Sequence, residues 1–415
     1  MKKLLQSKRR GSAIPLAVVA LLILLAMGTG LLSLGLNSRV FSIRTTSDIM
    51  ARCAADAGLT MALFRMNEKL PTLSWDVSTL PQAIDANLPN CDATYSYTVT
   101  GDLAKGYIIK SVGRSDQVQK TVSATLRLKG LFDNAIFVEQ SIIMNNNNQI
   151  LGYNSDTGET DLKIQIGTHS TAPGSIIFGS GTIDGDVVVG IGGDPETVVK
   201  SGGTVKGVTY ALSEEYELPT ITPPTLLPDM GTIDVLSTTL LSPADSGRYT
   251  SITSLHGEIL EISGGDVVLH ITGNINMDNF SEIRITDGSS LTLYVDGNIT
   301  CINGAGINNP SGNCTDFTLY GTGTEPQVFE LKNNSDVFGA VYAPNADIIL
   351  KNNAVLHGSV TAKNFTIKNN GIFYYDAALS DVSIIDEGVR FVVKRWYEGS
   401  TKSLTSNIEI EPVQK

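Results

Sequence analysis

The sequence has few of the side chains on which enzymes and metal proteins depend. Its 415 residues include four histidines and four cysteines, and they contain no CxxC pair, HExxH, GxSxG or phosphate-binding glycine loop. The histidines, at 169, 256, 270 and 357, are isolated from one another, and isolated histidines are more often surface or strand residues than ligands. We therefore expect no metal site, no cofactor and no enzymatic activity.

One pair of carboxylates keeps an alternative open. Asp184 and Asp186 are spaced to point to the same face of a strand, and polysaccharide-cleaving enzymes use paired carboxylates. The surrounding GTIDGD also fits Asp in a turn, which is the preferred interpretation. A membrane-anchored β-helix protein that binds or degrades polysaccharide stays as the alternative function.

Basic residues are scarce outside the N-terminus. The first ten residues hold five of them, so the remaining 25 basic residues stand against 42 acidic ones. An acidic body repels phosphates, and we expect no nucleic acid partner.

Aromatic residues make up 7% of the chain, whereas there are 40 glycines. This composition favours many short strands and turns.

Charge is absent altogether from Gly11 to Ser38. About 20 helical residues cross a bilayer core of about 30 Å, so this segment is long enough to span a membrane. The basic residues before it outnumber Arg39 and Arg44 after it, which places Met1 in the cytoplasm and the rest outside. A cleaved signal peptide is the competing interpretation, but its apolar region has only about 7–15 residues.

Helical periodicity continues beyond the apolar segment. Apolar residues recur at spacings of three, four or seven, and Pro71 with the prolines of 81–89 ends the pattern. We predict one helix over 12–70, apolar in its first half and amphipathic in its second; a plain single-pass anchor is the alternative. The residues predicted to form its apolar face are Val40, Ile43, Met50, Ala54, Ala57, Met61 and Phe64.

The junction QSKRRGSAIPLAVVALLILL resembles the leader of type IV pilins and pseudopilins, in which a short basic segment ends in glycine directly before the helix. The resemblance implies that a prepilin peptidase cuts after Gly11, which removes residues 1–11 and makes Ser12 the N-terminus. Pro15 fits the start of such a helix. Leu16 stands where most pilins have glutamate, a departure that fits minor pilins better than a major pilin.

The segment ARCAADAGLTMAL resembles the AAxAG segment of PilX-like minor pilins, and this resemblance covers roughly residues 1–130. TYSYTVTG, GYIIKSVGRS and QKTVSATLRLKG alternate apolar and polar residues between turns. They predict a three-stranded antiparallel meander within 71–130, packed on the amphipathic part of the helix. A generic sheet domain has the same pattern.

A repeated phrase marks the second half of the chain. LKNN at 331, LKNN at 350 and IKNN at 367 are separated by 19 and 17 residues. This spacing fits one coil of a parallel β-solenoid, whereas a β-sandwich of hairpins, the alternative, has no constant coil length. We predict that Leu331, Leu350 and Ile367 stack inside at about 4.8 Å per coil. Asn334, Asn353 and Asn370 stack at one corner, because asparagine tolerates left-handed backbone angles.

The same pattern predicts an all-β parallel β-helix over 131–380, following the α+β pilin-like module. A proline-rich insert, 213–247, interrupts it as an extended excursion along the solenoid. The passage VFGAVYAPNADIILKNNAVLHGSVTAKNFTIKNNGIFYYD also resembles the β-helical ectodomains of bacterial envelope proteins with PilX-like N-termini, and bactofilin coils. IFYYDAAL is expected to cap the last coil, and a strand pair in 381–415, followed by a tail, is expected to fold back over that coil or over the pilin-like head.

The cysteines fit an oxidising compartment. Outside the cytoplasm disulfides persist, so Cys301 and Cys314 are expected to staple a loop, and Cys53 and Cys91 to tie helix to sheet. Four free thiols are the alternative.

Together these features predict a pilin-like surface subunit, a minor or tip component of a type IV pilus or pseudopilus. It would lie in the bacterial inner membrane as a single-pass protein and then at the cell surface, for adhesion or filament assembly. The expected partners are other pilin or pseudopilin subunits and prepilin peptidase, with a surface glycan as a candidate ligand. An anchored scaffold that never enters a filament remains a further alternative.

Overall fold

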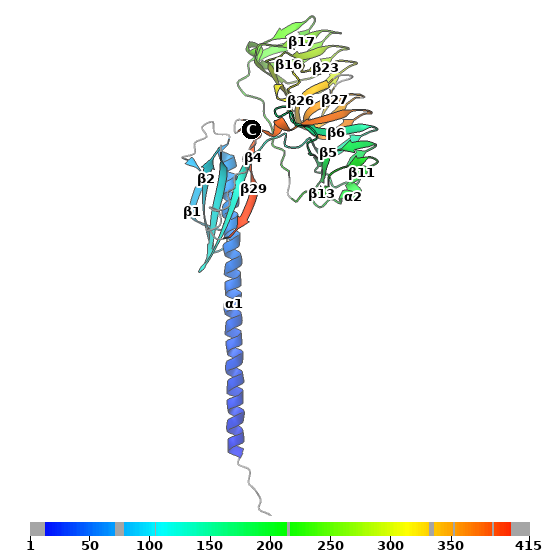
Figure 1. The fold of residues 1–415 in the computed structure, drawn as a ribbon. Helices are drawn as coiled ribbons and strands as arrows, with labels where there is room; N and C mark the ends of the chain where they lie inside the picture. The colour runs from blue at the N-terminus through cyan, green and yellow to red at the C-terminus, as the bar shows by residue number, and fades with distance from the viewer. Residues whose placement is uncertain are drawn as a thin grey trace, which may run out of the picture. The chain divides into compact units, whose positions relative to one another are not determined.

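The computed structural model describes residues 13–70, 79–103, 105–213, 216–331, 336–351, 353–383 and 386–399. The chain divides into two compact units, one formed by residues 1–127 with 391–415 and the other by residues 128–390. The first is a long helix packed on a small antiparallel sheet, and the second is a largely parallel β-solenoid (Figure 1). The predicted fold class is confirmed.

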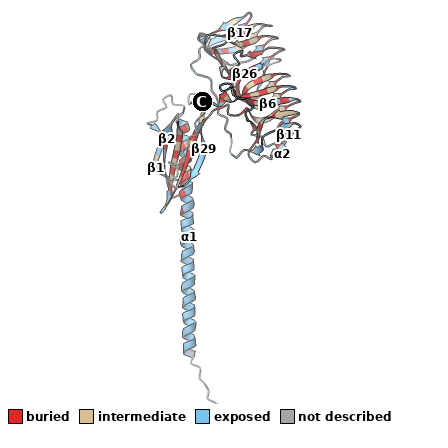
Figure 2. Cartoon of the chain, viewed as in Figure 1, coloured by how far each residue is buried: buried red, intermediate tan, exposed pale blue. Residues whose placement is uncertain are grey.

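The first half of helix α1 (Ala13–Lys69) has no buried side chain among the described residues. Every residue from Ile14 to Thr46 is exposed, as the pale blue helix in Figure 2 shows. Among the described residues, α1 is the one helix that is long and apolar enough to cross a bilayer, judged by length and composition.

The second half of α1 lies unusually close to the sheet. A Cβ on Gly113 would lie 2.0 Å from the Ala51 carbonyl oxygen and 2.3 Å from the Ala55 nitrogen, so only glycine fits there. The buried face of the helix is therefore built from small residues with a few larger ones: Ala51, Ala54, Ala55, Leu59, Ala62 and Met66. Of the residues predicted to form the apolar face, Ala54 is buried, whereas Val40, Ile43, Met50, Met61 and Phe64 are exposed. The close contact with the sheet favours small side chains on the buried face.

The predicted antiparallel meander of three strands is present, and two further strands among the described residues extend it to a five-stranded sheet in the order β1-β2-β3-β4-β29. The strands are β1 (Gln82–Asn87), β2 (Thr94–Asp102), β3 (Gly106–Ser115), β4 (Val118–Lys129) and β29 (Arg390–Glu398). The predicted pair of C-terminal strands is wrong for the described part of 381–415, which has the single strand β29. That strand joins the sheet next to β4.

Phe391 of strand β29 contacts helix α1 and strand β3 of the first unit. Its backbone N–H donates to the Asn67 side chain at 2.7 Å, and its carbonyl accepts from the Asn67 amide at 3.1 Å. The buried Phe391 ring meets Tyr107 edge-on, with ring centroids 5.3 Å apart. In sequence, the whole solenoid is therefore an insertion between β4 and β29.

The solenoid is built from short parallel strands whose inward side chains form one continuous apolar core. Its first part runs through β5 (Ile136–Met144), β6 (Asn148–Tyr153), β7 (Ile164–Thr168), β8 (Ile176–Phe178), β9 (Gly181–Ile183), β10 (Gly185–Val189), the short helix α2 (Pro195–Val198), β11 (Val199–Ser201), β12 (Thr204–Val205) and β13 (Thr209–Ala211).

The second part begins after an extended segment. It comprises β14 (Asp229–Val235), β15 (Thr239–Leu241), β16 (Gly247–Ser254), β17 (Ile259–Ile262), β18 (Asp266–Ile271), β19 (Ile275–Met277), β20 (Glu282–Ile285), β21 (Ser290–Val295), β22 (Ile299–Cys301), β23 (Gly306–Asn308), β24 (Phe317–Gly321), β25 (Gln327–Leu331), β26 (Asp336–Leu350), β27 (Val355–Ile367) and β28 (Ile372–Asp376). Short 3-10 turns, η2 (Pro243–Asp245), η3 (Cys314–Asp316) and η4 (Ala377–Ser380), lie between or after these strands.

The coils are not stacked in sequence order. Strand β27 pairs in parallel with β26 on one side and β5 on the other, and β28 pairs with both β27 and β6. The coil that comes last in the chain therefore lies in the middle of the solenoid, against the coil that comes first. The expectation that IFYYDAAL caps an open end is wrong, because the first coil already covers that edge.

The segment between the two parts, 216–228, has no regular strand and crosses several coils. The Tyr342 hydroxyl donates to the Pro219 carbonyl at 2.7 Å, and Ile221 is buried among Tyr294, Tyr320 and Tyr342, which occupy successive coils. Strands β14 and β15 fall within the predicted insert 213–247, so regular structure resumes at Asp229.

The chain enters and leaves the solenoid at neighbouring points. Gly388, near the exit, contacts Leu131, near the entry. The Lys129 ammonium lies 4.1 Å from the centroid of the Tyr216 ring, and the Arg390 guanidinium lies 5.9 Å from the same ring. Tyr216 thus marks the point where entry, exit and crossing segment meet.

Candidate functional site

The repeated aliphatic residues occupy one column of the core. Leu331 pairs with Leu350, Leu350 with Ile367, and Ile367 with Met144 of the first coil. Met144 in turn pairs with Phe178. All five side chains are buried, so the repeat marks a core column that runs on into a part of the chain without the LKNN phrase.

The asparagines form a ladder at the following corner. Asn353, Asn370 and Asn147 each have a φ of 58°, a left-handed angle that asparagine tolerates better than most residues. Asn147 donates its amide to Asn370 at 3.4 Å, and Asn370 donates to Asn353 at 3.3 Å. The predicted corner residue Asn334 lies outside the described residues. Asn147 has the same role but was missed, because the run NNNN obscures which asparagine turns the corner.

The four cysteines all lie among the described residues, and none of the four forms a disulfide. The expected bridges, Cys301 to Cys314 and Cys53 to Cys91, are not formed. Cys301 points into the solenoid core, with its Sγ 3.8 Å from the Met277 Sδ, whereas Cys314 Sγ lies 3.4 Å from the Tyr153 hydroxyl. Burial raises the pKa of the Cys314 thiol to about 12, so this thiol is protonated at neutral pH.

The two carboxylates considered for catalysis each contact the next coil. The Lys206 ammonium donates to Asp184 at 2.6 Å, and Asp186 accepts the backbone N–H of Val208 at 2.8 Å. These contacts join neighbouring coils rather than closing a local turn, and Asp186 lies within strand β10.

The four histidines lie apart from one another, and each contacts a different residue or pair of residues. His169 contacts Glu139, His270 contacts Asp296, and the ring of His357 lies between Phe338 and Tyr374. His256 meets Phe280 edge-on. Within the described ranges, no group of three or more His, Cys, Asp or Glu side chains could hold a metal ion.

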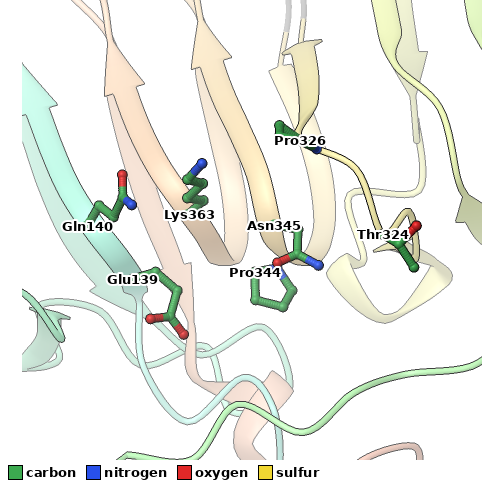
Figure 3. A pocket seen from close by; sticks show the side chains of 7 residues that line it. All are labelled: Glu139, Gln140, Thr324, Pro326, Pro344, Asn345 and Lys363. Carbon is green, nitrogen blue, oxygen red and sulfur yellow. The ribbon is translucent and has the colours of Figure 1, made fainter.

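The solenoid carries a pocket of about 440 Å³ on one of its corners. Figure 3 shows side chains from three adjacent coils and one loop around it. The lining residues are Glu139 and Gln140 of β5, Lys363 of β27, Pro344 and Asn345 of β26, and Thr324 and Pro326 of the loop between β24 and β25.

Extra residues at this corner create the pocket. Between the paired positions on either side of the corner, β27 has only Lys363, β5 has Glu139 and Gln140, and β26 has three residues, including Pro344 and Asn345. Unequal numbers of residues in neighbouring strands disrupt the ladder and redirect side chains, and such irregularities are common next to functional sites. No pattern in the sequence indicates this pocket, since its residues come from four separate segments.

The polar groups of the pocket are partly held in place. The Glu139 carboxylate lies 3.0 Å from His169 Nδ1. The Asn345 amide donates to the Gly323 carbonyl at 3.3 Å, and the Gln140 side-chain oxygen accepts from the Asn364 amide at 3.4 Å. The Lys363 ammonium has no partner among the described residues. One carboxylate and one ammonium leave the lining without net charge.

The predicted processing site, Gly11 and Ser12, lies outside the described residues. Helix α1 begins at Ala13, directly after it.

Comparisons with known proteins find one family model that is similar to part of the solenoid. A family model described as a domain of unknown function (DUF7305) matches residues 232–382. Among curated proteins, no sequence matches the chain.

Among solved structures, the chain is similar to the competence-associated pilin ComZ from Thermus thermophilus, with 14% sequence identity. The match covers 85% of this chain and 98% of that chain, with a TM-score of 0.26. Two ice-binding proteins, from the ascomycete Antarctomyces psychrotrophicus and from Shewanella frigidimarina, are each 13% identical over 59% of this chain. The matches cover 96% and 94% of those chains, with TM-scores of 0.25 and 0.26. Such low values assign no function to this chain.

Proposed function

We propose that this chain is a non-enzymatic, pilin-like surface subunit that acts as a minor or tip component of a type IV pilus or related pseudopilus. The observation that carries the proposal is the N-terminal segment: a basic leader ends at Gly11, directly before a helix that is apolar and wholly exposed from Ile14 to Leu36. An apolar surface of this length requires a bilayer or other helices around it.

Assembly would follow from the two halves of α1. Before assembly the apolar half spans the inner membrane with Met1 in the cytoplasm, and prepilin peptidase removes residues 1–11. The same half then packs against the helices of other pilin or pseudopilin subunits. The second half of α1 carries the five-stranded sheet, and the solenoid, which lies between β4 and β29 in the sequence, is displayed outside for adhesion or filament assembly.

N-terminal processing tests this proposal. Co-expression with an active prepilin peptidase should yield a mature chain that begins at Ser12, read by N-terminal sequencing. Gly11→Leu should abolish the cut, whereas Ser7→Leu, a matched change within the leader, should leave it unchanged. An intact Met1 terminus in the presence of the active peptidase would contradict the proposal.

A further inference from the structure

The pocket on the solenoid corner combines a suitable size with an unusual lining. Its volume of about 440 Å³ lies within the range of about 300–1,000 Å³ typical of small-molecule sites. The lining holds two carboxamides, a carboxylate, an ammonium, a hydroxyl and two proline rings, and it holds no aromatic or large aliphatic side chain. An apolar ligand would bury little surface there.

The charges of the lining restrict the ligand further. The negative charge of Glu139 and the positive charge of Lys363 lie in the same pocket, so neither a multiply charged anion nor a cation is favoured over a neutral molecule. Carboxamides both donate and accept hydrogen bonds, the ammonium donates, and the carboxylate accepts. A ligand that suits this set must offer donors and acceptors side by side, as neighbouring hydroxyl groups do.

The site is also pre-arranged on rigid elements. Glu139 and Gln140 belong to β5 and Lys363 belongs to β27, and both strands pair with neighbours on both sides within the solenoid. Figure 3 shows the two strands with these side chains. Pro326 and Pro344 fix the backbone of the other two segments and present flat C–H surfaces. A preformed site of this kind loses little conformational entropy when it binds a ligand.

We infer that this pocket binds a neutral saccharide unit of a surface glycan. Lys363 and the carboxamides of Gln140 and Asn345 donate to its hydroxyl oxygens, Glu139 accepts from its hydroxyl groups, and a proline ring contacts its C–H face. The inference names a ligand for the proposed surface subunit and rests on that function, since the pocket meets a glycan only if the solenoid is displayed outside.

Binding by the full-length chain tests the inference. The protein is kept in a zwitterionic detergent, because detergents with sugar head groups would compete. Isothermal titration with maltotetraose, cellotetraose and chitotetraose is compared with titration of tetragalacturonate and of a neutral tetrapeptide. At least one neutral oligosaccharide should bind, and the anion and the peptide should not.

Two pairs of matched variants locate the site. Thr324→Trp fills the pocket and should weaken binding at least about tenfold, whereas Glu325→Trp, next to it in the same exposed loop but outside the lining, should not. Lys363→Met removes the free ammonium and should also weaken binding at least about tenfold. Lys368→Met, an exposed lysine five positions further on, should leave the affinity unchanged.

Several results would overturn the inference. The inference is wrong if the wild type binds no neutral oligosaccharide, or if it binds only the anion or the peptide. It is also wrong if both pocket variants bind with the same affinity as the wild type. Failure here is distinguishable from failure of the proposed function. A chain that starts at Ser12 and enters filaments but binds no saccharide contradicts only the inference, and a chain that binds but is never processed contradicts only the proposed function.

Discussion

At the scale of single residues, the solenoid corners depend on backbone angles that few residues accept. Asn147, Asn353 and Asn370 share a φ of 58° and bond to one another from coil to coil. Their neighbour Asn148 has a different role: it is fully buried, and its Oδ1 accepts the Gly371 backbone N–H at 2.8 Å. Asparagine is therefore used both for turning the chain and for satisfying buried backbone groups.

Replacing Asn370 separates the contribution of its left-handed backbone angle from that of its side-chain hydrogen bonds. Asn370→Ala puts an unfavourable residue at a left-handed angle and should lower the free energy of unfolding by roughly 1–2 kcal/mol. Asn370→Gly loses the same side-chain bonds but accepts the angle, so its loss should be smaller. Denaturant unfolding of the full chain in detergent measures both. Equal losses in the two variants would show that the side-chain bonds, rather than the backbone angle, decide the stability of the corner.

The His357 side chain should make the solenoid less stable in mild acid. Its ring is stacked between Phe338 and Tyr374, with centroids 4.2 and 4.6 Å away. Burial lowers its pKa below the ordinary 6.5, against the opposing effect of Asp336 and Asp376. The unfolded chain therefore takes up this proton more readily, and stability present above pH 6.5 is lost as the pH falls through the lower pKa of the folded state.

His357→Phe keeps a stacked ring and removes the proton site. The variant should lose less stability than the wild type between about pH 7 and 5, as thermal unfolding in detergent would measure. His256→Phe, at an exposed position, serves as the control and should follow the wild type. An identical pH dependence in the His357 variant and the wild type would contradict this account.

At the scale of elements, the contact between helix and sheet is set by small residues. The Ala-rich segment of α1 allows the close approach at Gly113, and Gly58 similarly lies against Ser111. The alternation of β2 and β3 was readable from sequence, because each of these strands has one face on the helix. The buried face of α1 was only partly readable, since periodicity favoured Met61 and Phe64 by size, whereas the contact requires small side chains.

Gly113→Ala tests this contact. The added Cβ would overlap the Ala51 carbonyl oxygen, so the helix must shift, and the first unit should lose roughly 1–3 kcal/mol of stability. Gly28→Ala is the control, because a Cβ there meets nothing within 4 Å. Hydrogen exchange of the β3 amides, followed by mass spectrometry, should speed up in the first variant only. Unchanged exchange in Gly113→Ala would mean that the helix does not lie this close to the sheet.

At the scale of the whole molecule, the order of the coils could not be predicted from the sequence. The phrase at 331, 350 and 367 marks neighbouring coils that follow one another in the chain. The pairing of β28 with β6 and the return of β29 to the first sheet join segments more than 200 residues apart, and such pairings leave no local periodic signal. For the same reason the pocket, assembled from four segments, was invisible in the sequence.

The central claim is that the apolar half of α1 carries this chain into a filament after cleavage at Gly11. Quantitative mass spectrometry of filaments sheared from cells that express the full chain tests it most directly. We expect solenoid peptides in the sheared fraction together with an N-terminal peptide that begins at Ser12, both absent when the prepilin peptidase is inactive. A chain found only in the membrane fraction, with Met1 intact while the major pilin is cut and assembled, would contradict the claim.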